Sequence, residues 1–438
     1  MPLPELSWLA RARLLVCAGL VAVTAAVPAA HASAPPPPDQ DRFYTYTGAQ
    51  PLAQVAPGTV LKHRAIRASF GPHRTPVDAD QLLYRTTDQL GAPTVTVTTV
   101  LRPQHRRVLP KLVGYLSFYD GLGARCDPSY TLNGGMGGSA IEQQSEEEDL
   151  LMEFYIAQGF VVTVPDFEGE GHHWMAGRES GYGSLDGIRA TESFLHLATS
   201  TPVGLSGYSG GALAGDWAAE LAPSYAPKLN LVGVAAGGVP VDYWHMFDYI
   251  NGTKTYSAAI PAMLLGLARA YHVDLTSYLS TYGAKVVGEL QKACMTAVFG
   301  NYPGLTIAKI MKPAYADLRT VPVFVNILNE QIMGTVPGHP RAPYFLGNGN
   351  TDGRGDGVMS AGDVRTLARE YCKQGVVVDY REYQHASHIT AGAFFDPETG
   401  LFLQDRLAGL PFRGNCRSIR PGTDISPEPM PAAGSSGT

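Results

Sequence analysis

Residues 203–211 of the chain read VGLSGYSGG, a short apolar segment that leads directly into the pattern Gly-x-Ser-x-Gly. In this pattern a buried strand turns sharply into a helix, and the turn lifts the serine hydroxyl above the edge of a sheet. Gly207 and Gly211 let strand and helix approach closely, because neither residue carries a Cβ. The stretch therefore predicts Ser209 as a nucleophile, with Ser206 as a neighbour that only shares the turn.

The segments on either side of this motif alternate between strand and helix patterns. Residues 213–221 have helical spacing, and Trp217 lies on their apolar side. This alternation is typical of a parallel sheet flanked by helices, so we expect an α/β-hydrolase fold with a mostly parallel central sheet. We expect strands at 112–118, 160–164, 203–205, 229–235, 343–346 and 376–383, and a further helix at 364–371.

The 438 residues are expected to form one catalytic domain, residues 33–417, between two terminal segments. Basic residues, an apolar run at 14–27 and the small-residue site Ala30-His31-Ala32 are typical of a signal peptide, residues 1–32. That run is too short for a membrane helix, so we expect a secreted protein with no transmembrane segment. Residues 418–438 are rich in Pro, Gly and Ser and are expected to form a disordered tail.

Residues 243–310 interrupt the strand–helix rhythm. This stretch is rich in Leu, Ala, Tyr and Met and is biased towards helix. It stands where α/β-hydrolases commonly insert a cap, and we expect a helical lid whose apolar underside faces the substrate. Extra packing helices are the alternative interpretation.

Charge and cysteine content narrow the function classes. Only 16% of the residues are charged and the formal net charge is −6, so the sequence gives no basic footprint for nucleic acid. Cys17 is removed with the signal peptide. The sequence contains no C-x-x-C pair, so it does not predict a metal site with cysteine ligands. In an oxidising compartment, two disulfides with three possible pairings are expected among Cys126, Cys294, Cys372 and Cys416.

A serine nucleophile needs a base, and in this fold the acid and the histidine follow the serine along the chain. His385 and His388 both follow the last expected strand, while His339 is a weaker candidate. Residues 347–359, after the preceding strand, offer Asp352 and Asp356 as acids. Asp363 is a third possible acid, and spacing alone does not choose among these residues.

The same acidic loop has two competing interpretations. Asp352, Asp356, Gly357 and Asp363 fall at positions 1, 5, 6 and 12 of a calcium-loop pattern. Arg354 stands at position 3 and the last position is not Glu, which argues against calcium. Residues 354–356 also spell Arg-Gly-Asp, an adhesion tripeptide that we attribute to chance.

Taken together, these segments resemble the secretory lipase family. The resemblance covers roughly residues 40–416, nearly the whole mature chain, and it is the combination of segments that is specific. It is carried by Tyr119-Asp120, Cys126-Asp127-Pro128-Ser129-Tyr130, Gly207 to Ala212 with Trp217 to Pro223, Gly237-Gly238-Val239-Pro240, and Asp356-Gly357-Val358-Met359 with Tyr371-Cys372, Gly375 and His388.

The resemblance implies roles that spacing leaves open. The family's acid precedes an apolar pair that leads into a helix, which matches Asp356, and its histidine lies thirteen residues after a glycine, which matches His388. Asp120 and Gly210 correspond to the family's oxyanion hole. The implied disulfides are Cys126–Cys294 and Cys372–Cys416. The family usually has an acidic residue before the histidine, whereas this chain has Ser387.

The resemblance further implies a secreted lipase that hydrolyses acylglycerols or other carboxylic esters through an acyl-enzyme, with no cofactor and no metal. Its partner would be a lipid or ester substrate, at a lipid–water interface. Because one triad serves many reactions, a short-chain carboxylesterase or an acyltransferase is an alternative. A catalytically inactive secreted binding protein is a more remote one.

Overall fold

The computed structural model describes residues 35–432, apart from 71–72, 75–76, 105–109 and 135–139. The expected signal peptide, residues 1–32, lies outside the described residues. The central sheet has nine strands in the order β1-β4-β5-β7-β6-β8-β9-β10-β11, and β2 and β3 form a small separate hairpin. The strands are β1 Val60–Ile66, β2 Ser69–Phe70, β3 His73–Arg74, β4 Asp78–Thr87, β5 Pro93–Arg102, β6 Leu112–Leu116, β7 Val161–Pro165, β8 Pro202–Tyr208, β9 Asn230–Gly237, β10 Tyr344–Asn350 and β11 Val378–Gln384.

Six neighbouring strands, from β7 to β11 in the sheet order, are parallel. The expected mostly parallel sheet of an α/β-hydrolase is therefore confirmed. Strands β1, β4 and β5 were not predicted from the sequence. Strand β4 pairs antiparallel with both β1 and β5, and β5 pairs antiparallel with β7. These three antiparallel strands lie at one end of the sheet order, with β1 at the edge, so β8, which leads into the motif, lies inside the sheet.

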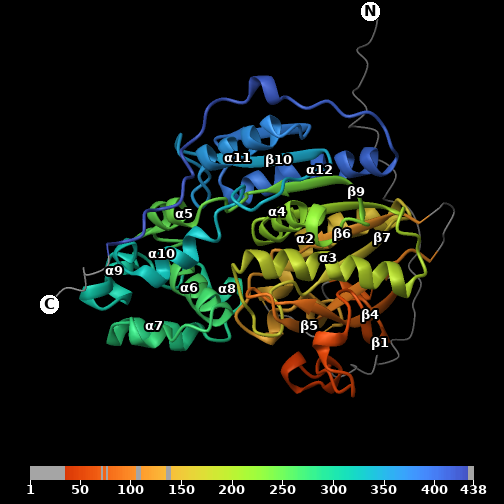
Figure 1. Ribbon diagram of the computed structural model, residues 1–438, viewed down its shortest axis with the longest axis horizontal. Helices are drawn as coiled ribbons and strands as arrows, with labels where there is room; N and C mark the ends of the chain where they lie inside the picture. The colour runs from red at the N-terminus through yellow and green to blue at the C-terminus, as the bar shows by residue number, and fades with distance from the viewer. Residues whose placement is uncertain (1–34, 71–72, 75–76, 105–109, 135–139, 433–438) are drawn as a thin grey trace, which may run out of the picture. The chain divides into compact units, whose positions relative to one another are not determined.

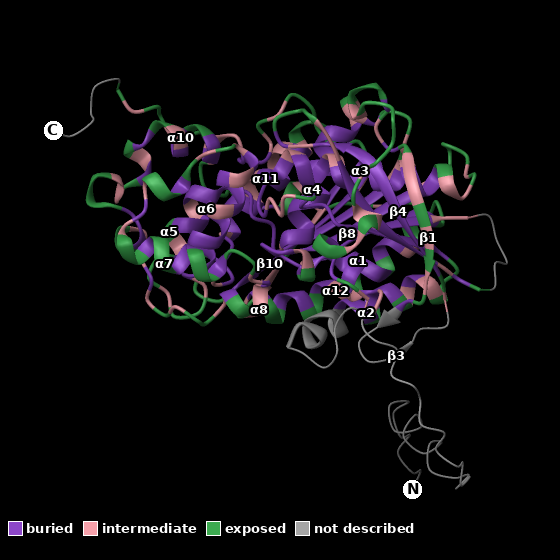
Figure 2. Ribbon diagram, turned by 90° about the horizontal axis from the view of Figure 1, so that it is seen from below, coloured by how far each residue is buried: buried purple, intermediate pink, exposed green. Residues whose placement is uncertain are grey.

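Helices cover both faces of the sheet, and Figure 2 shows the strands buried between them. Successive residues of β9 separate the two faces, because side chains of a strand alternate in direction. Val234 and Ala236 join the core under α3, α4 and α11, whereas Ala235 joins the core under α2 and α12. The covering helices are α2 Ala140–Ala157, α3 Gly177–Phe194, α4 Gly210–Tyr225, α11 Ala361–Lys373 and α12 His388–Leu407.

A helical insertion joins β9 to β10 and gathers on one side of the sheet (Figure 1). It continues to Asn329, beyond the expected end of the cap near residue 310. Met246 and Met263, from its first two helices, are buried in the same core as the strands. Its helices are α5 Tyr243–Ile250, α6 Ala259–Ala270, α7 Thr281–Leu290, α8 Met295–Val298, α9 Ile307–Ile310 and α10 Pro322–Asn329, while the short α1 Pro128–Thr131 precedes α2.

The chain after α12 returns along α11 to the cap helices (Figure 1). Arg369 donates to the Ile419 carbonyl at 2.8 Å, Thr423 N donates to Gly362 O at 3.2 Å, and Asn329 donates to the Glu428 carbonyl at 2.8 Å. Residues 419–432 are thus bound along the body, which differs from the disordered tail expected from their composition. An extended Pro-rich segment has no internal hydrogen bonds, so its carbonyls are free to accept them. Side chains of the neighbouring helices donate to some of these carbonyls here.

Candidate active site

Ser209 lies in the sharp turn between β8 and α4 that the sequence predicts. Its φ of 53° and ψ of −118° are strained for a residue with a Cβ, and its N–H donates to Gly237 O at 2.8 Å. A Cβ on Gly207 would come within 2.3 Å of Gly211 O, and a Cβ on Gly211 within 1.9 Å of Leu116 O. The two glycines are therefore required by close backbone approach. Ser206 is buried and accepts a hydrogen bond from Tyr155 instead.

His388 is the histidine that reaches Ser209, with Nε2 2.9 Å from Ser209 Oγ. It is the first residue of α12, and Ser387 caps this helix by accepting from Thr390 N. The residue that replaces the family's usual acid thus has a local structural role. Tyr208, the variable residue of the motif, donates its hydroxyl to the His388 carbonyl at 2.5 Å. Nothing in the sequence pattern singled out Tyr208 for this contact.

Asp356 is the acid beside the imidazole. Its Oδ2 lies 2.8 Å from His388 Nδ1, and its Oδ1 accepts from Val358 N at 2.9 Å and Met359 N at 2.7 Å. Since a carboxylate only accepts, Nδ1 carries the proton towards Asp356 and Nε2 is free to face Ser209. The carboxylate is 1% exposed, so both its oxygens are bound within the protein.

The other histidines and aspartates that the sequence offered for the triad form no side-chain hydrogen bond with Ser209 or His388 in the described part of the chain. His385 and His339 are exposed, and the His385 N–H donates to Asn350 O. Asp352 is exposed and accepts from Arg354 N, Gly355 N and Tyr249 Oη. Asp363 is buried on α11, where it pairs with the cap residue His245 at 3.0 Å.

The positions of these aspartates also argue against the two other interpretations of the acidic loop, a calcium site and an adhesion tripeptide. The carboxylates of Asp352, Asp356 and Asp363 each have different protein partners, so they do not converge on one calcium ion. Among the described residues, no group of three or more His, Cys, Asp and Glu side chains is arranged to hold a metal. The Arg-Gly-Asp tripeptide is not presented to a partner, because the carboxylate of Asp356 is buried.

Asp120 and Gly210 meet beside Ser209. Gly210 is the first residue of α4, so its N–H has no acceptor within the helix. A Cβ on Gly210 would lie 1.8 Å from Asp120 Oδ1, an atom that is buried without a hydrogen-bond partner in the described structure. Burial raises the pKa of Asp120 to about 7, and the nearby His388 and Trp174 side chains oppose this rise. A neutral Asp120 carboxyl is a hydrogen-bond donor.

All these groups follow the carboxyl ends of parallel strands. Asp120 comes after β6, Ser209 after β8, Asp356 after β10 and His388 after β11. Carboxyl ends of parallel strands meet at one edge of a sheet, which is where open α/β folds bind ligands. The sheet therefore brings together residues that are up to 268 positions apart, from Asp120 to His388.

The cavity above Ser209 is apolar and small. The body supplies Trp174 beside Asp120, Ser209 and His388, and the cap supplies most of the remaining wall. The space open to a water-sized sphere is about 30 Å³, enough for a water or two. The apolar wall residues are Met175, Pro240, Met246, Ile250, Ala259, Met263, Phe299, Val358 and Met359.

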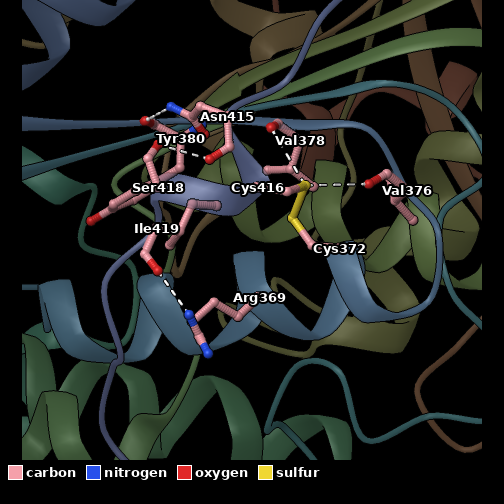
Figure 3. Close-up of a disulfide and its surroundings, with 9 residues drawn as sticks. All are labelled: Arg369, Cys372, Val376, Val378, Tyr380, Asn415, Cys416, Ser418 and Ile419. Carbon is pink, nitrogen blue, oxygen red and sulfur yellow. Dashed lines mark hydrogen bonds between the residues drawn. A yellow bond between two sulfur atoms is a disulfide. The ribbon is translucent and has the colours of Figure 1, made fainter.

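Both expected disulfides are present. Cys126–Cys294 joins the loop after Asp120 to the cap, and Leu122 N donates to Ala293 O beside it. Cys372–Cys416 joins the end of α11 to the segment after α12 (Figure 3). The second bridge lies near Val376 and Val378, at the start of β11 and away from the edge that carries His388.

Comparison with known proteins gives the family. Residues 138–415 match the family model described as secretory lipase. The chain belongs to the secretory lipase family. It is therefore a secreted lipase, an enzyme that hydrolyses carboxylic esters. Among the described residues, no helix is both long and apolar enough to cross a membrane.

Relatives of this secretory lipase cover most of the chain. Lipase A of Arthroderma benhamiae is 33% identical over 88% of this chain and 83% of its own. A secreted triacylglycerol lipase of Malassezia restricta is 30% identical over 91% and 86%. The structure of Candida antarctica lipase A in its closed state superposes with a TM-score of 0.80, 27% identity, and 90% and 93% coverage. A protein named probable inactive lipase, from Mycobacterium tuberculosis, is 32% identical over 86% and 83%.

Proposed function

We propose that this secretory lipase hydrolyses acylglycerols with Ser209 as nucleophile, His388 as base and Asp356 as the acid that orients it. The observation that carries the proposal is the hydrogen-bonded series from Asp356 Oδ2 through the imidazole to Ser209 Oγ, with contacts of 2.8 and 2.9 Å. A nucleophile hydrogen-bonded to a base that a third group orients is the arrangement of acyl-transfer catalysis.

The proposed reaction has two halves. His388 Nε2 takes the proton of Ser209 as Oγ attacks the ester carbonyl, and Asp356 stabilises the imidazolium that forms. The Gly210 N–H and the neutral Asp120 carboxyl donate to the negatively charged oxygen. Collapse of this intermediate breaks the ester C–O bond, and the imidazolium protonates the departing alcohol. Water, deprotonated by His388, then attacks the acyl-enzyme and releases the fatty acid and Ser209.

The apolar cap supports a long-chain substrate. Side chains such as Met246, Met263 and Phe299 line the cavity over Ser209, and the relative from Malassezia restricta is named a triacylglycerol lipase. Each methylene of an acyl chain that leaves water for such a wall contributes about 0.8 kcal/mol. The side chains over Ser209 leave little open space, and we infer that the cap moves before a long-chain ester binds, as contact with a lipid–water interface would promote.

A chain-length series tests the substrate. Hydrolysis of p-nitrophenyl esters from acetyl to palmitoyl, and of emulsified triacylglycerols, should show kcat/KM rising with acyl length. The variant Met263→Asp places a carboxylate in the acyl wall and should lower the rate on long esters more than on acetate. A preference for acetyl or butyryl esters together with no action on emulsions would instead make the enzyme a short-chain carboxylesterase.

Covalent labelling tests the proposed nucleophile directly, and it also separates this chain from a relative whose name is probable inactive lipase. An organophosphonate should label the wild-type chain once, at Ser209, as read by mass spectrometry of its peptides. Ser209→Ala should take no label and should lose hydrolysis by on the order of 10⁶-fold while it keeps its melting temperature. A wild-type chain that takes no label would be a binding protein rather than an enzyme.

A further inference from the structure

The indole N–H of Trp174 is a buried donor that lies near the Asp120 carboxyl but forms no hydrogen bond of acceptable geometry with any described residue. Of the three tryptophans in the described part of the chain, Trp244 donates to Asn329 Oδ1 at 3.0 Å. The Nε1 atoms of Trp174 and Trp217 have no hydrogen-bond partner among the described residues. An unsatisfied buried donor costs about 1–3 kcal/mol, so each needs a physical explanation.

The two unpaired indoles differ in their surroundings. Trp174 is 3% exposed and lines the cavity that contains Ser209, Gly210 and Asp120. Trp217 is absent from the lining of this cavity and lies against Gly177, where a Cβ would meet its Nε1 at 2.1 Å. Of these two unpaired indoles, Trp174 is the one on the wall of the Ser209 cavity, so it is the one placed near a ligand bound there. The chain thus contains a matched pair of indoles, one inside the site and one outside it.

The backbone around Trp174 is held in a strained conformation. His172 and Met175, on either side, have φ values of 51° and 72°, which cost of order 1–3 kcal/mol each in a residue with a side chain. The segment is fixed at Met175 by the Tyr243 hydroxyl at 3.0 Å, and a Cβ on Gly266 of α6 would meet Trp174 O at 2.3 Å. Backbone strain of this kind persists only where the surrounding structure holds the segment in place, and it is common at active sites.

Asp120 connects Trp174 to the reacting atoms. Its Oδ1 lies against Gly210, and the Trp174 indole approaches its carboxyl closely enough to oppose the rise of the Asp120 pKa, although the two do not reach hydrogen-bonding geometry. An ester oxygen beside the Gly210 N–H therefore also lies beside the groups of Asp120 and Trp174. Neither Asp120 Oδ1 nor Trp174 Nε1 has a hydrogen-bond partner among the described residues, and one ligand oxygen between them would accept from both when Asp120 is protonated.

We propose that the Trp174 indole N–H donates a hydrogen bond to the carbonyl oxygen of the bound ester, and more strongly to the oxyanion formed from it. Trp174 is then a further catalytic residue, beside Gly210 and Asp120. The inference rests on the proposed role of Ser209, because it requires the ester carbonyl to lie over that hydroxyl. The strained segment of residues 172–175 and the cap helix α6 would hold the donor in place.

Kinetics of two matched variants test the proposal. Trp174→Phe and Trp217→Phe each remove one buried indole N–H and keep an aromatic ring. Trp174→Phe should lower kcat/KM for an oxoester on the order of 10²-fold, and Trp217→Phe should change it less than threefold. For the matched thionoester, whose sulfur accepts hydrogen bonds weakly, the loss in Trp174→Phe should shrink to a few-fold. An equal loss on both esters would assign Trp174 to packing and overturn the proposal.

A second measurement uses the wild-type chain and does not depend on the folding of Trp174→Phe. A trifluoromethyl ketone should add to Ser209 and leave an oxyanion in the site. In a ¹⁵N-labelled protein, the indole proton of Trp174 should then move downfield by more than 1 ppm, while those of Trp217 and Trp244 stay in place; Trp217→Phe and Trp244→Phe identify the signals. Ketone bound with the Trp174 signal unmoved would overturn this inference alone. Failure of the ketone to bind would instead contradict the proposed role of Ser209.

Discussion

The main-chain N–H of His388 donates to the main-chain carbonyl of Asp356 at 2.8 Å, parallel to the contact between their side chains. The two residues follow neighbouring parallel strands, β10 and β11, and two contacts fix one against the other. A ring held at its backbone and at Nδ1 has little freedom to turn away from Ser209. The backbone contact explains how the acid and the histidine keep their relative position although both lie outside regular strands.

His388 is expected to be essential and His385 dispensable. His388→Ala removes the group 2.9 Å from Ser209 Oγ and should lower kcat by about 10⁶-fold. His385→Ala, on the same loop but exposed, should change kcat by less than threefold. Hydrolysis of p-nitrophenyl butyrate measures both. A larger loss in His385→Ala than in His388→Ala would move the base to His385.

The two nearby aspartates should respond differently to amide substitution. Asp356→Asn presents an N–H₂ or a neutral oxygen to His388 Nδ1, disfavours the required tautomer and should cost about 10⁴-fold in kcat. Asp352→Asn changes an exposed turn residue and should leave kcat within a factor of three. Circular dichroism should show both variants folded at the assay temperature. The opposite order of losses would make Asp352 the acid.

Activity should fall as the pH rises through about 7, because Asp120 then loses the proton with which it donates to the oxyanion. Its pKa is raised to about 7 by burial, so the carboxyl is neutral below this pH and negative above it. His388 opposes this rise, and the neighbouring carboxyl of Glu168 also has a pKa well above its usual value because of burial and of Asp120. The measurement is kcat/KM of the wild type from pH 5 to 9.

Asp120→Asn is the control for that profile. The amide donates a hydrogen bond at every pH, so the variant should lose the decline above pH 7, while Asp120→Ala should be slow by on the order of 10² at all pH values. A decline that persists unchanged in Asp120→Asn would assign it to another group, and Asp120 would then not be a proton-bearing donor.

The two disulfides should separate stability from catalysis. Cys372→Ser/Cys416→Ser should lower the free energy of unfolding by about 2–4 kcal/mol but keep kcat, because this bridge lies away from the catalytic edge. Cys126→Ser/Cys294→Ser should lower both, since its bridge ties the loop of Asp120 to the cap. Denaturant melts and ester hydrolysis at 25 °C measure the two quantities. Equal kcat in the two variants would show that the cap bridge has no catalytic role.

The sequence by itself determined the features that depend on neighbouring residues. The turn at Ser209 is encoded locally, because Gly207 and Gly211 permit a backbone approach that any Cβ would block. Strands β6 and β7 were predictable, since each is buried on both faces and reads as a nearly continuous apolar run. The resemblance also gave the pairing of both disulfides.

Only the tertiary structure decided relationships between distant segments. Asp352 and Asp356 have the same local chemistry, and the register of β10 beside β11 brings Asp356 to His388. The antiparallel edge strands and the bound course of residues 419–432 depend on long-range partners, which composition does not encode. The sequence also cannot show that the N–H of Trp174 lacks a hydrogen-bond partner among the described residues, because this depends on which residues surround it in the folded chain.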